Sequence, residues 1–325
     1  MTSVLILGAA GMVGRKLTEQ LVRSKRLRGA EISKLSLVDV FAPTAPADSP
    51  CPVETQAVDF SRTGVAERLI QSRPDVIFHL AAIVSGEAEA DYDKGYTINL
   101  DGTRELFEAI RNAGDGYCPR VVFTSSIAVF GAPFPDPIPD DFHLTPLTSY
   151  GTQKAIGEML LSDLTRRGMM DGIGIRLPTI VVRPGKPNKA ASGFFSGIIR
   201  EPLNGQEALL PVTEDVMHWM ASPRAAVNFL IHAAEIEGEA IGTRRNLTMP
   251  GLAVTVGEQL ETLRRIGGEA RMKLVRREPD QTIAGIVAGW PRRFDAARAK
   301  NLGFVADESF DAIVRAYIED EGIPV

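Results

Sequence analysis

The sequence of 325 residues has little cysteine and no long apolar run. Its two cysteines, Cys51 and Cys118, stand in separate segments without CxxC or His-rich neighbours, so neither a disulfide framework nor a metal site is expected. No run approaches the roughly 18 apolar residues that a membrane span needs, and no basic segment precedes the first strand-like residues at Val4. We therefore expect reduced thiols, a cytoplasmic location and no membrane partner.

The sequence also lacks a surplus of positive charge. It has 36 Lys and Arg against 41 Asp and Glu, a net charge of −5, and the basic residues are scattered rather than clustered. Nucleic acid is therefore not an expected partner. With 44% hydrophobic residues, a chain of this length can bury one large core and a smaller second one.

Short β-branched runs alternate with amphipathic stretches in the first half of the chain. This rhythm predicts an α/β fold, a Rossmann-like doubly wound parallel sheet over residues 1–183, joined by a helix at 222–236. Residues 184–325 should form a smaller C-terminal substrate-binding lobe, with a Gly-, Pro- and Asn-rich stretch at 184–212 and short helices between turns at 250–325. Ala42–Pro52, with four prolines, should be an exposed loop. Strands are expected at Val4–Leu7, Leu35–Asp39, Val76–Leu80, Arg120–Ser125 and Ile173–Val182, and helices near Gly11–Arg23, Gly64–Ser72, Tyr92–Asn112 and Tyr150–Arg167.

A glycine-rich turn follows the first strand. Gly8, Gly11 and Gly14, with Met12 and Val13 among them, permit a tight turn into a helix whose N-terminus can face a pyrophosphate. Taken alone, such a turn can also be purely structural. Asp39 ends the second strand, where a carboxylate can bind the adenosine ribose hydroxyls and repel a 2′-phosphate, which favours NAD over NADP. The alternative for Asp39 is a structural role as a turn or N-cap residue.

A second pattern opens a later helix. Tyr150 and Lys154 are four residues apart and share one helix face, although this spacing also arises by chance. A lysine about 4 Å away contributes on the order of 4 kcal/mol at an effective dielectric near 20, roughly three pKa units and an upper bound because burial opposes it. We expect Lys154 to bring the pKa of Tyr150 near the working pH, so that the phenol acts as a general base. Upstream, Ser125 and Ser126 end a buried strand at the edge where such sheets bind ligands; Ser126 should face the substrate and Ser125 point away.

These motifs fall in the order found in extended short-chain dehydrogenase/reductases, which the chain resembles over essentially its whole length. The resemblance implies NAD as cofactor, with Ser126, Tyr150 and Lys154 as catalytic residues and a homodimer built through the helices near 92–112 and 150–167. Taken alone, Asp59 reads as a turn residue, His79 as a core histidine, Trp219 as core and Asn99 as a helix-surface amide. The cofactor-binding residues that it implies are Gly8, Gly11, Met12, Val13, Gly14, Asp39, Asp59, Phe60, Leu80, Ala81, Ala82, Asn99, Tyr150, Lys154 and Pro178.

The substrate is less constrained, because this family also contains nucleotide-sugar epimerases and dehydratases. The residues beside Ser126 are not acidic, which disfavours dehydration, and Glu214 stands where many members place a diphosphate-binding arginine. The segments around His79, Arg176 and His218 resemble dehydrogenases that oxidise the 2-hydroxyl of a four-carbon sugar acid. We expect a small hydroxy acid, with a nucleotide-sugar oxidoreductase as the alternative and a non-catalytic cofactor-binding protein ranked below both. The expected substrate contacts are Ser85, Ser126, Tyr150, Thr179, Arg183 and Arg224, with Lys186 as a third candidate for holding the carboxylate.

Overall fold

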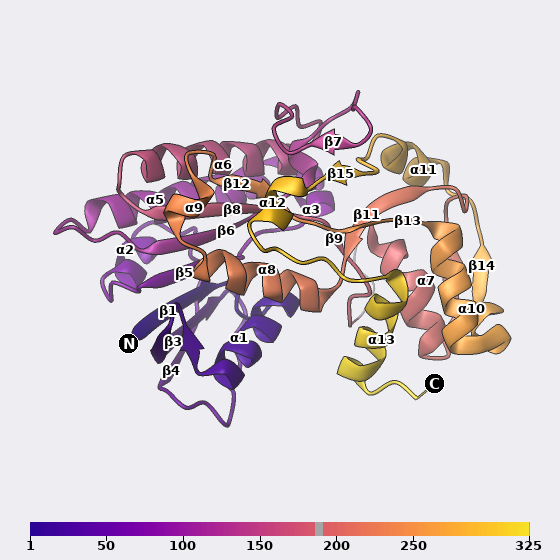
Figure 1. Cartoon of the computed structure of the whole chain (residues 1–325), viewed down its shortest axis with the longest axis horizontal. Coiled ribbons are helices and arrows are strands. Elements are labelled where there is room, and N and C mark those ends of the chain that lie inside the picture. The colour runs from indigo at the N-terminus through magenta and orange to yellow at the C-terminus, as the bar shows by residue number, and fades with distance from the viewer. Residues whose placement is uncertain (186–190, 325) are drawn as a thin grey trace.

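The computed structural model describes residues 1–185 and 191–324. Its main sheet runs β12-β8-β6-β5-β1-β3-β2, with β4 also paired to β3, and all of these strands are parallel except β2 (Figure 1). The expected doubly wound parallel sheet is thus confirmed. The strands are β1 (Thr2–Leu7), β2 (Arg26–Leu27), β3 (Ala30–Asp39), β4 (Val53–Ala57), β5 (Val76–His79), β6 (Arg120–Ser126), β8 (Asp171–Leu177) and β12 (Asn246–Thr248).

Helices cover both faces of this sheet, which is why its central strands are apolar on both sides. Helices α1 (Met12–Ser24) and α8 (Pro223–Glu235) pack together on one face, where Leu17, Leu21 and Phe229 are buried. Helices α2 (Val65–Ile70), α5 (Gly102–Asn112) and α6 (Ser149–Arg166) cover the other face. Helix α8 therefore packs on strands β6 and β8 of the main sheet.

Two expected elements differ in detail. The helical stretch from 92 consists of α4 (Tyr92–Gly95), the π-helical segment η1 (Tyr96–Asp101) and α5. The strand expected to continue to Val182 ends at Leu177, because Pro178 has no N–H for the ladder. The chain then leaves the main sheet, and β9 (Thr179–Ile180) pairs with β11 (Met217–Ala221).

A second core lies beside the main sheet, at the right of Figure 1. Its helix α7 (Gly193–Leu203) lies in the Gly-, Pro- and Asn-rich stretch at 184–212, for which no helix was predicted. It forms because Phe195, Ile198, Ile199 and Leu203 share one buried face. The other elements here are β10 (Ala208–Leu210), β13 (Leu252–Thr255), α10 (Val256–Met272), β14 (Val275–Arg277), α11 (Gln281–Ala288) and α13 (Phe310–Glu321).

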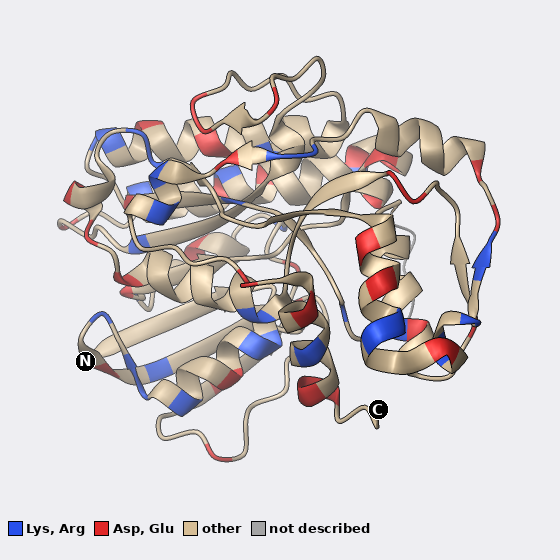
Figure 2. Cartoon of the chain, turned by 45° about the vertical axis from the view of Figure 1, so that its right-hand side comes forward, with Lys and Arg blue, Asp and Glu red and all other residues tan. Residues whose placement is uncertain are grey.

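The remaining elements are short, and both signs of charge are interspersed along the chain (Figure 2). Within residues 1–185 and 191–324, no helix combines the length and apolar character needed to cross a membrane. The short elements are α3 (Ser85–Ala90), η2 (Ile127–Val129), β7 (Ile138–Pro139), α9 (Gly238–Ile241), β15 (Phe294–Asp295) and α12 (Ala297–Asn301).

Candidate active site

The turn from β1 into α1 leaves no room for side chains at its glycines. Gly8 has φ of 88°, and a Cβ there would lie 2.7 Å from the backbone nitrogen of Ala81. A Cβ on Gly14 would lie 2.2 Å from the carbonyl oxygen of Gly8. Gly11 is the N-cap of α1 and supplies no capping side chain, so the first N–H groups of the helix lack a side-chain acceptor. The turn is thus a close-packed site with backbone donors suited to a pyrophosphate.

Asp39 lies beside this turn, at the carboxyl end of β3. Its Oδ2 accepts a hydrogen bond from the N–H of Ala10 at 3.0 Å, and its Oδ1 accepts one from Phe41 at 3.1 Å. The carboxylate is partly exposed at the helix N-terminus, where a dinucleotide's adenosine ribose would lie. The contact of Asp39 with the ribose of NAD stays a prediction.

The loop after β5 forms the opposite wall of the turn. Leu80 and Ala82 face the cavity described below, whereas Ala81 packs its backbone against Gly8. Asn99 holds this loop: its Oδ1 accepts from the N–H of Ile83 at 2.9 Å, and its Nδ2 donates to the carbonyl of Ile83 and to Gln153. Asn99 is thus buried rather than a helix-surface amide, and it positions the loop.

Asp59 and Phe60 follow β4 at the same edge of the sheet. Asp59 accepts from the N–H and hydroxyl of Ser61, which is the turn role that its sequence context suggests. Phe60 is 5% exposed, and its ring packs edge-on against His79. His79 is also core: its Nε2 bonds Thr103, and burial lowers its pKa to about 3.

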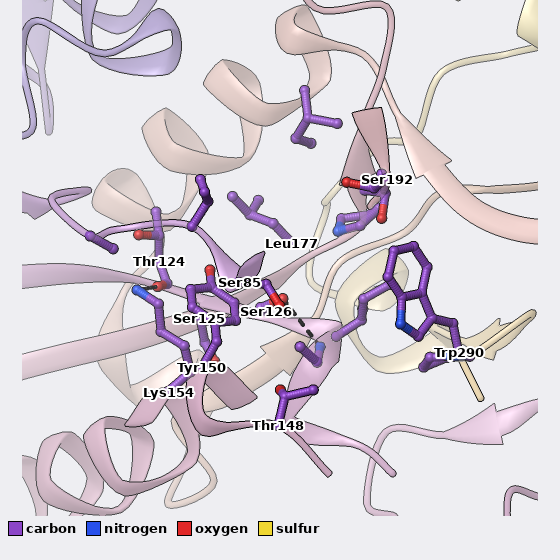
Figure 3. Close-up of a pocket in the computed structure, with 18 of the residues that line it drawn as sticks. Ser85, Thr124, Ser125, Ser126, Thr148, Tyr150, Lys154, Leu177, Ser192 and Trp290 are labelled. Carbon is purple, nitrogen blue, oxygen red and sulfur yellow. Dashed lines mark hydrogen bonds between the residues drawn. The ribbon is translucent and has the colours of Figure 1, made fainter. Parts of the chain in front are cut away.

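One cavity of about 370 Å³ opens beside the carboxyl ends of β6 and β8 (Figure 3). Met12 and Val13 line it from the glycine turn, Ser126 and Tyr150 from the opposite wall, and Pro178 from the end of β8. Ser126 and Leu177 are register partners across β6 and β8, which brings the serine next to the Pro178 segment. The cavity therefore connects the cofactor turn with the expected catalytic residues, and these surroundings fit NAD.

Ser126, Tyr150 and Lys154 come together at this cavity (Figure 3). The Oγ of Ser126 accepts a hydrogen bond from the N–H of Ala128 at 3.1 Å, and Ser126 lies close enough to Tyr150 to affect its pKa. The Nζ of Lys154 donates to the carbonyl of Thr124 at 2.8 Å and lies 5.7 Å from the centre of the Tyr150 ring. Ser125 points the other way and donates to Glu158 at 2.5 Å, as the alternation of side chains along a strand predicts.

The expected pKa of Tyr150 is wrong for the protein without ligands. Burial raises the pKa of Tyr150 to about 12, and the neighbouring Ser126 only partly opposes this effect. Burial also lowers the pKa of Lys154 to about 7, which weakens the ammonium charge that was expected to stabilise the phenolate. Desolvation outweighs the lysine charge in this site, and the phenol needs a further positive charge to act as a base near pH 7.

Three expected substrate contacts line the same cavity: Ser85, Thr179 and Arg183. Burial and the neighbouring Arg200 lower the pKa of Arg183. Among residues 1–185 and 191–324, no carboxylate lies within salt-bridge distance of its guanidinium, and residues 186–190 contain no Asp or Glu. Arg183 thus brings a partly desolvated positive charge without a counter-ion to the cavity.

Arg224 does not reach this cavity, contrary to expectation. It lies on α8, half-exposed, and pairs with Glu319 and Asp320 of α13. Glu214 also lies outside the cavity, where Arg277 pairs with it and offsets the charge that was expected to repel a diphosphate. Lys186 falls outside the described residues.

Some cavity residues were missed at the sequence level. His218 and Trp290 line the cavity from segments far from the catalytic motifs, and Ser192 lies at the N-cap of α7. His218 had appeared only as part of a resembling segment, and no motif marks Trp290. Trp219 is core, as favoured: it is 6% exposed, and its Nε1 donates to the carbonyl of Met249 at 3.2 Å.

The fold and the cavity, at which Ser126, Tyr150 and Lys154 meet, are those of an NAD-dependent oxidoreductase. The model of the NAD dependent epimerase/dehydratase family matches residues 4–221, and the chain belongs to this family. The expected family, enzyme class and cofactor are thereby confirmed.

Individual relatives indicate the class of substrate on which this oxidoreductase acts. The chain is 47% identical to the D-erythronate dehydrogenase of Cupriavidus necator, over 99% of both chains, and 40% identical to that of Haemophilus influenzae, over 97% of this chain and 98% of the relative. It is also similar to the crystal structure of the nucleoside-diphosphate-sugar epimerase from Agrobacterium tumefaciens, with 63% identity, a TM-score of 0.97 and coverage of 99% and 95%. The two D-erythronate dehydrogenases support an NAD-dependent dehydrogenase of sugar acids, whereas the Agrobacterium tumefaciens structure carries the name of an epimerase.

Proposed function

We propose that this protein oxidises the 2-hydroxyl of a small sugar acid, D-erythronate, to the 2-oxo acid by hydride transfer to NAD. The observation that carries the proposal is the charge of the cavity beside Ser126 and Tyr150. Its described lining contains Lys154, Arg183 and the buried His218 as basic residues and no Asp or Glu. Such a site attracts an anion, and the planar guanidinium of Arg183 suits a carboxylate next to the reacting carbon.

The protein's own residues divide the chemistry of this oxidation. The oxygen of Ser126 accepts a hydrogen bond from the N–H of Ala128, so its hydroxyl proton can be donated to the oxygen on C2. Tyr150, as phenolate, takes the proton from the C2 hydroxyl, and NAD, when bound, would accept the hydride that leaves C2. Lys154 favours the phenolate, as would the positive charge of bound NAD, and both oppose the burial that raises the pKa of Tyr150. The proton thus leaves through Tyr150, and the product is a 2-oxo acid.

The second candidate is a nucleotide-sugar 4-epimerase, favoured by the 63% identity to the Agrobacterium tumefaciens structure. A diphosphate requires several cations or backbone donors near the sugar. In the described lining, Arg183 is the one arginine available to a diphosphate, since the ammonium of Lys154 already donates to the carbonyl of Thr124. The small acid therefore fits the cavity better than the diphosphate.

A substrate panel separates the two candidates. Purified protein is mixed with NAD and D-erythronate, with other C4 to C6 aldonic acids, or with UDP-glucose, and NAD reduction is followed by absorbance. Calorimetry measures UDP-sugar binding, and sugar analysis tests for epimerisation. We expect the hydroxy acids to reduce NAD. Micromolar UDP-sugar binding with epimerisation, and no oxidation of any acid, would instead establish the epimerase.

We also propose a cytoplasmic homodimer. Tyr92 on α4 and Met159 on α6 are 59% and 61% exposed, on the helices through which the dimer was expected to form. The free thiols of Cys51 and Cys118 suit a reducing compartment. Light scattering after size exclusion tests the dimer, with Met159→Glu expected to shift it toward monomer.

A further inference from the structure

His218 is held in a single protonation pattern by its two hydrogen-bond partners. Its Nδ1 lies 2.9 Å from the carbonyl oxygen of Pro291, and its Nε2 lies 2.6 Å from the hydroxyl of Thr179. A carbonyl oxygen can only accept, so Nδ1 must carry the proton. Burial also lowers the pKa of His218 to about 4, which keeps the ring neutral near pH 7. The neutral ring then has only a lone pair at Nε2.

This pattern determines what Thr179 can offer to a ligand. Because Nε2 can only accept, the hydroxyl of Thr179 must donate its one proton to the histidine. Thr179 lines the cavity, and its hydroxyl oxygen is left with lone pairs only. It can accept a hydrogen bond from a ligand but cannot donate one to it.

Packing holds this arrangement in place. The His218 ring is 2% exposed and stacks on Phe195, with 5.2 Å between centroids and 5° between planes. Pro291 follows Trp290, which lines the cavity, and Thr179 follows Pro178 next to the end of β8. The histidine therefore connects three segments of the cavity wall.

We infer that Thr179, oriented by His218, is a specificity residue that accepts a hydrogen bond from a substrate hydroxyl beyond C2, and that His218 is its positioning residue. The inference rests on the proposed function, because it places C2 between Ser126 and Tyr150. An acid without such a hydroxyl leaves the acceptor of Thr179 unpaired in a partly dry site. Thr179 thus favours substrates that carry a hydroxyl on the third or fourth carbon.

The test compares D-erythronate with 2,4-dihydroxybutanoate, 2,3-dihydroxybutanoate and 2-hydroxybutanoate. We expect kcat/KM for D-erythronate to exceed that for 2-hydroxybutanoate by roughly tenfold to a hundredfold, and one single-deoxy acid to share most of that loss. In Thr179→Val the ratio should fall toward one, whereas Thr179→Ser, which keeps the hydroxyl, should retain it. His218→Phe should lower the ratio of the two kcat/KM values. A variant that is merely less well folded would lower kcat/KM for both acids in proportion and would keep the ratio unchanged.

An activity-independent measurement checks the positioning role. Nitrogen NMR of ¹⁵N-histidine-labelled protein should show His218 protonated at Nδ1 alone across the neutral pH range. Protonation at Nε2, or an unchanged substrate ratio in Thr179→Val, would overturn the inference while leaving the proposed function intact. Failure to oxidise any acid of the panel would overturn the proposed function, and the inference with it.

Discussion

Replacing Arg183 with Ala tests the anion site most directly. Its guanidinium is partly desolvated and repelled by Arg200, and no described carboxylate balances it. A bound substrate carboxylate would supply that balance through charge-assisted hydrogen bonds. Removing one partner of such a pair costs about 2–5 kcal/mol, so kcat/KM for the hydroxy acid should fall roughly 30-fold to several-thousand-fold.

The assay is steady-state NAD reduction, with NAD affinity measured separately by fluorescence. Affinity for NAD should stay within about twofold, because the loss concerns the substrate. Arg224→Ala is the matched control: it removes an arginine that pairs with Glu319 and Asp320 outside the cavity, so its kinetics should match the wild type. Unchanged kinetics in Arg183→Ala would refute Arg183 as the carboxylate partner.

Three further variants, one of them with a matched surface control, test the rest of the site and fold. Tyr150→Phe should lower turnover by at least about a hundredfold and still bind NAD, and near-normal turnover of this variant would contradict the mechanism. Oxidation by the wild type should speed up as pH rises through neutrality, because the phenolate fraction of Tyr150 grows as pH approaches its pKa of about 12. Asp39→Ser should raise kcat/KM for NADP relative to NAD, unless the wild type already uses both equally. Glu158→Gln leaves the buried Arg176 uncompensated and should cost roughly 3–5 kcal/mol in urea unfolding, whereas Asp163→Asn at the surface should cost under about 1 kcal/mol.

Most of the main sheet could be predicted, because period and length distinguish buried parallel strands from amphipathic helices. Val4–Leu7 and Arg120–Ser125 lie within observed strands, with ends extended by one or two residues. The polar strand β4 and the three-residue β12 were missed, since their sequences carry no apolar pattern. Helix α7 was missed because its Gly193 and Pro202 are poor helix residues. Tertiary packing overrides propensity at such positions.

The candidate site divides in a similar way. Ser126, Tyr150 and Lys154 could be predicted because they stand at strand ends and helix starts with recognisable spacing. His218 and Trp290 reach the cavity only through the tertiary fold, and no local pattern announces that. The pKa of Tyr150 could not be predicted, because it depends on burial that the sequence does not reveal.

The return of the chain to its first sheet restricts how this enzyme can be re-engineered. Helix α8 covers Val122, Ile173 and Ile175, and β12 pairs with β8 along Gly174–Arg176. A fragment ending at residue 183 would expose that apolar face to water and leave β8 as an open edge. The segment after residue 183 therefore cannot be exchanged between relatives as one piece, because part of it belongs to the first sheet. New specificity has to be introduced one cavity residue at a time.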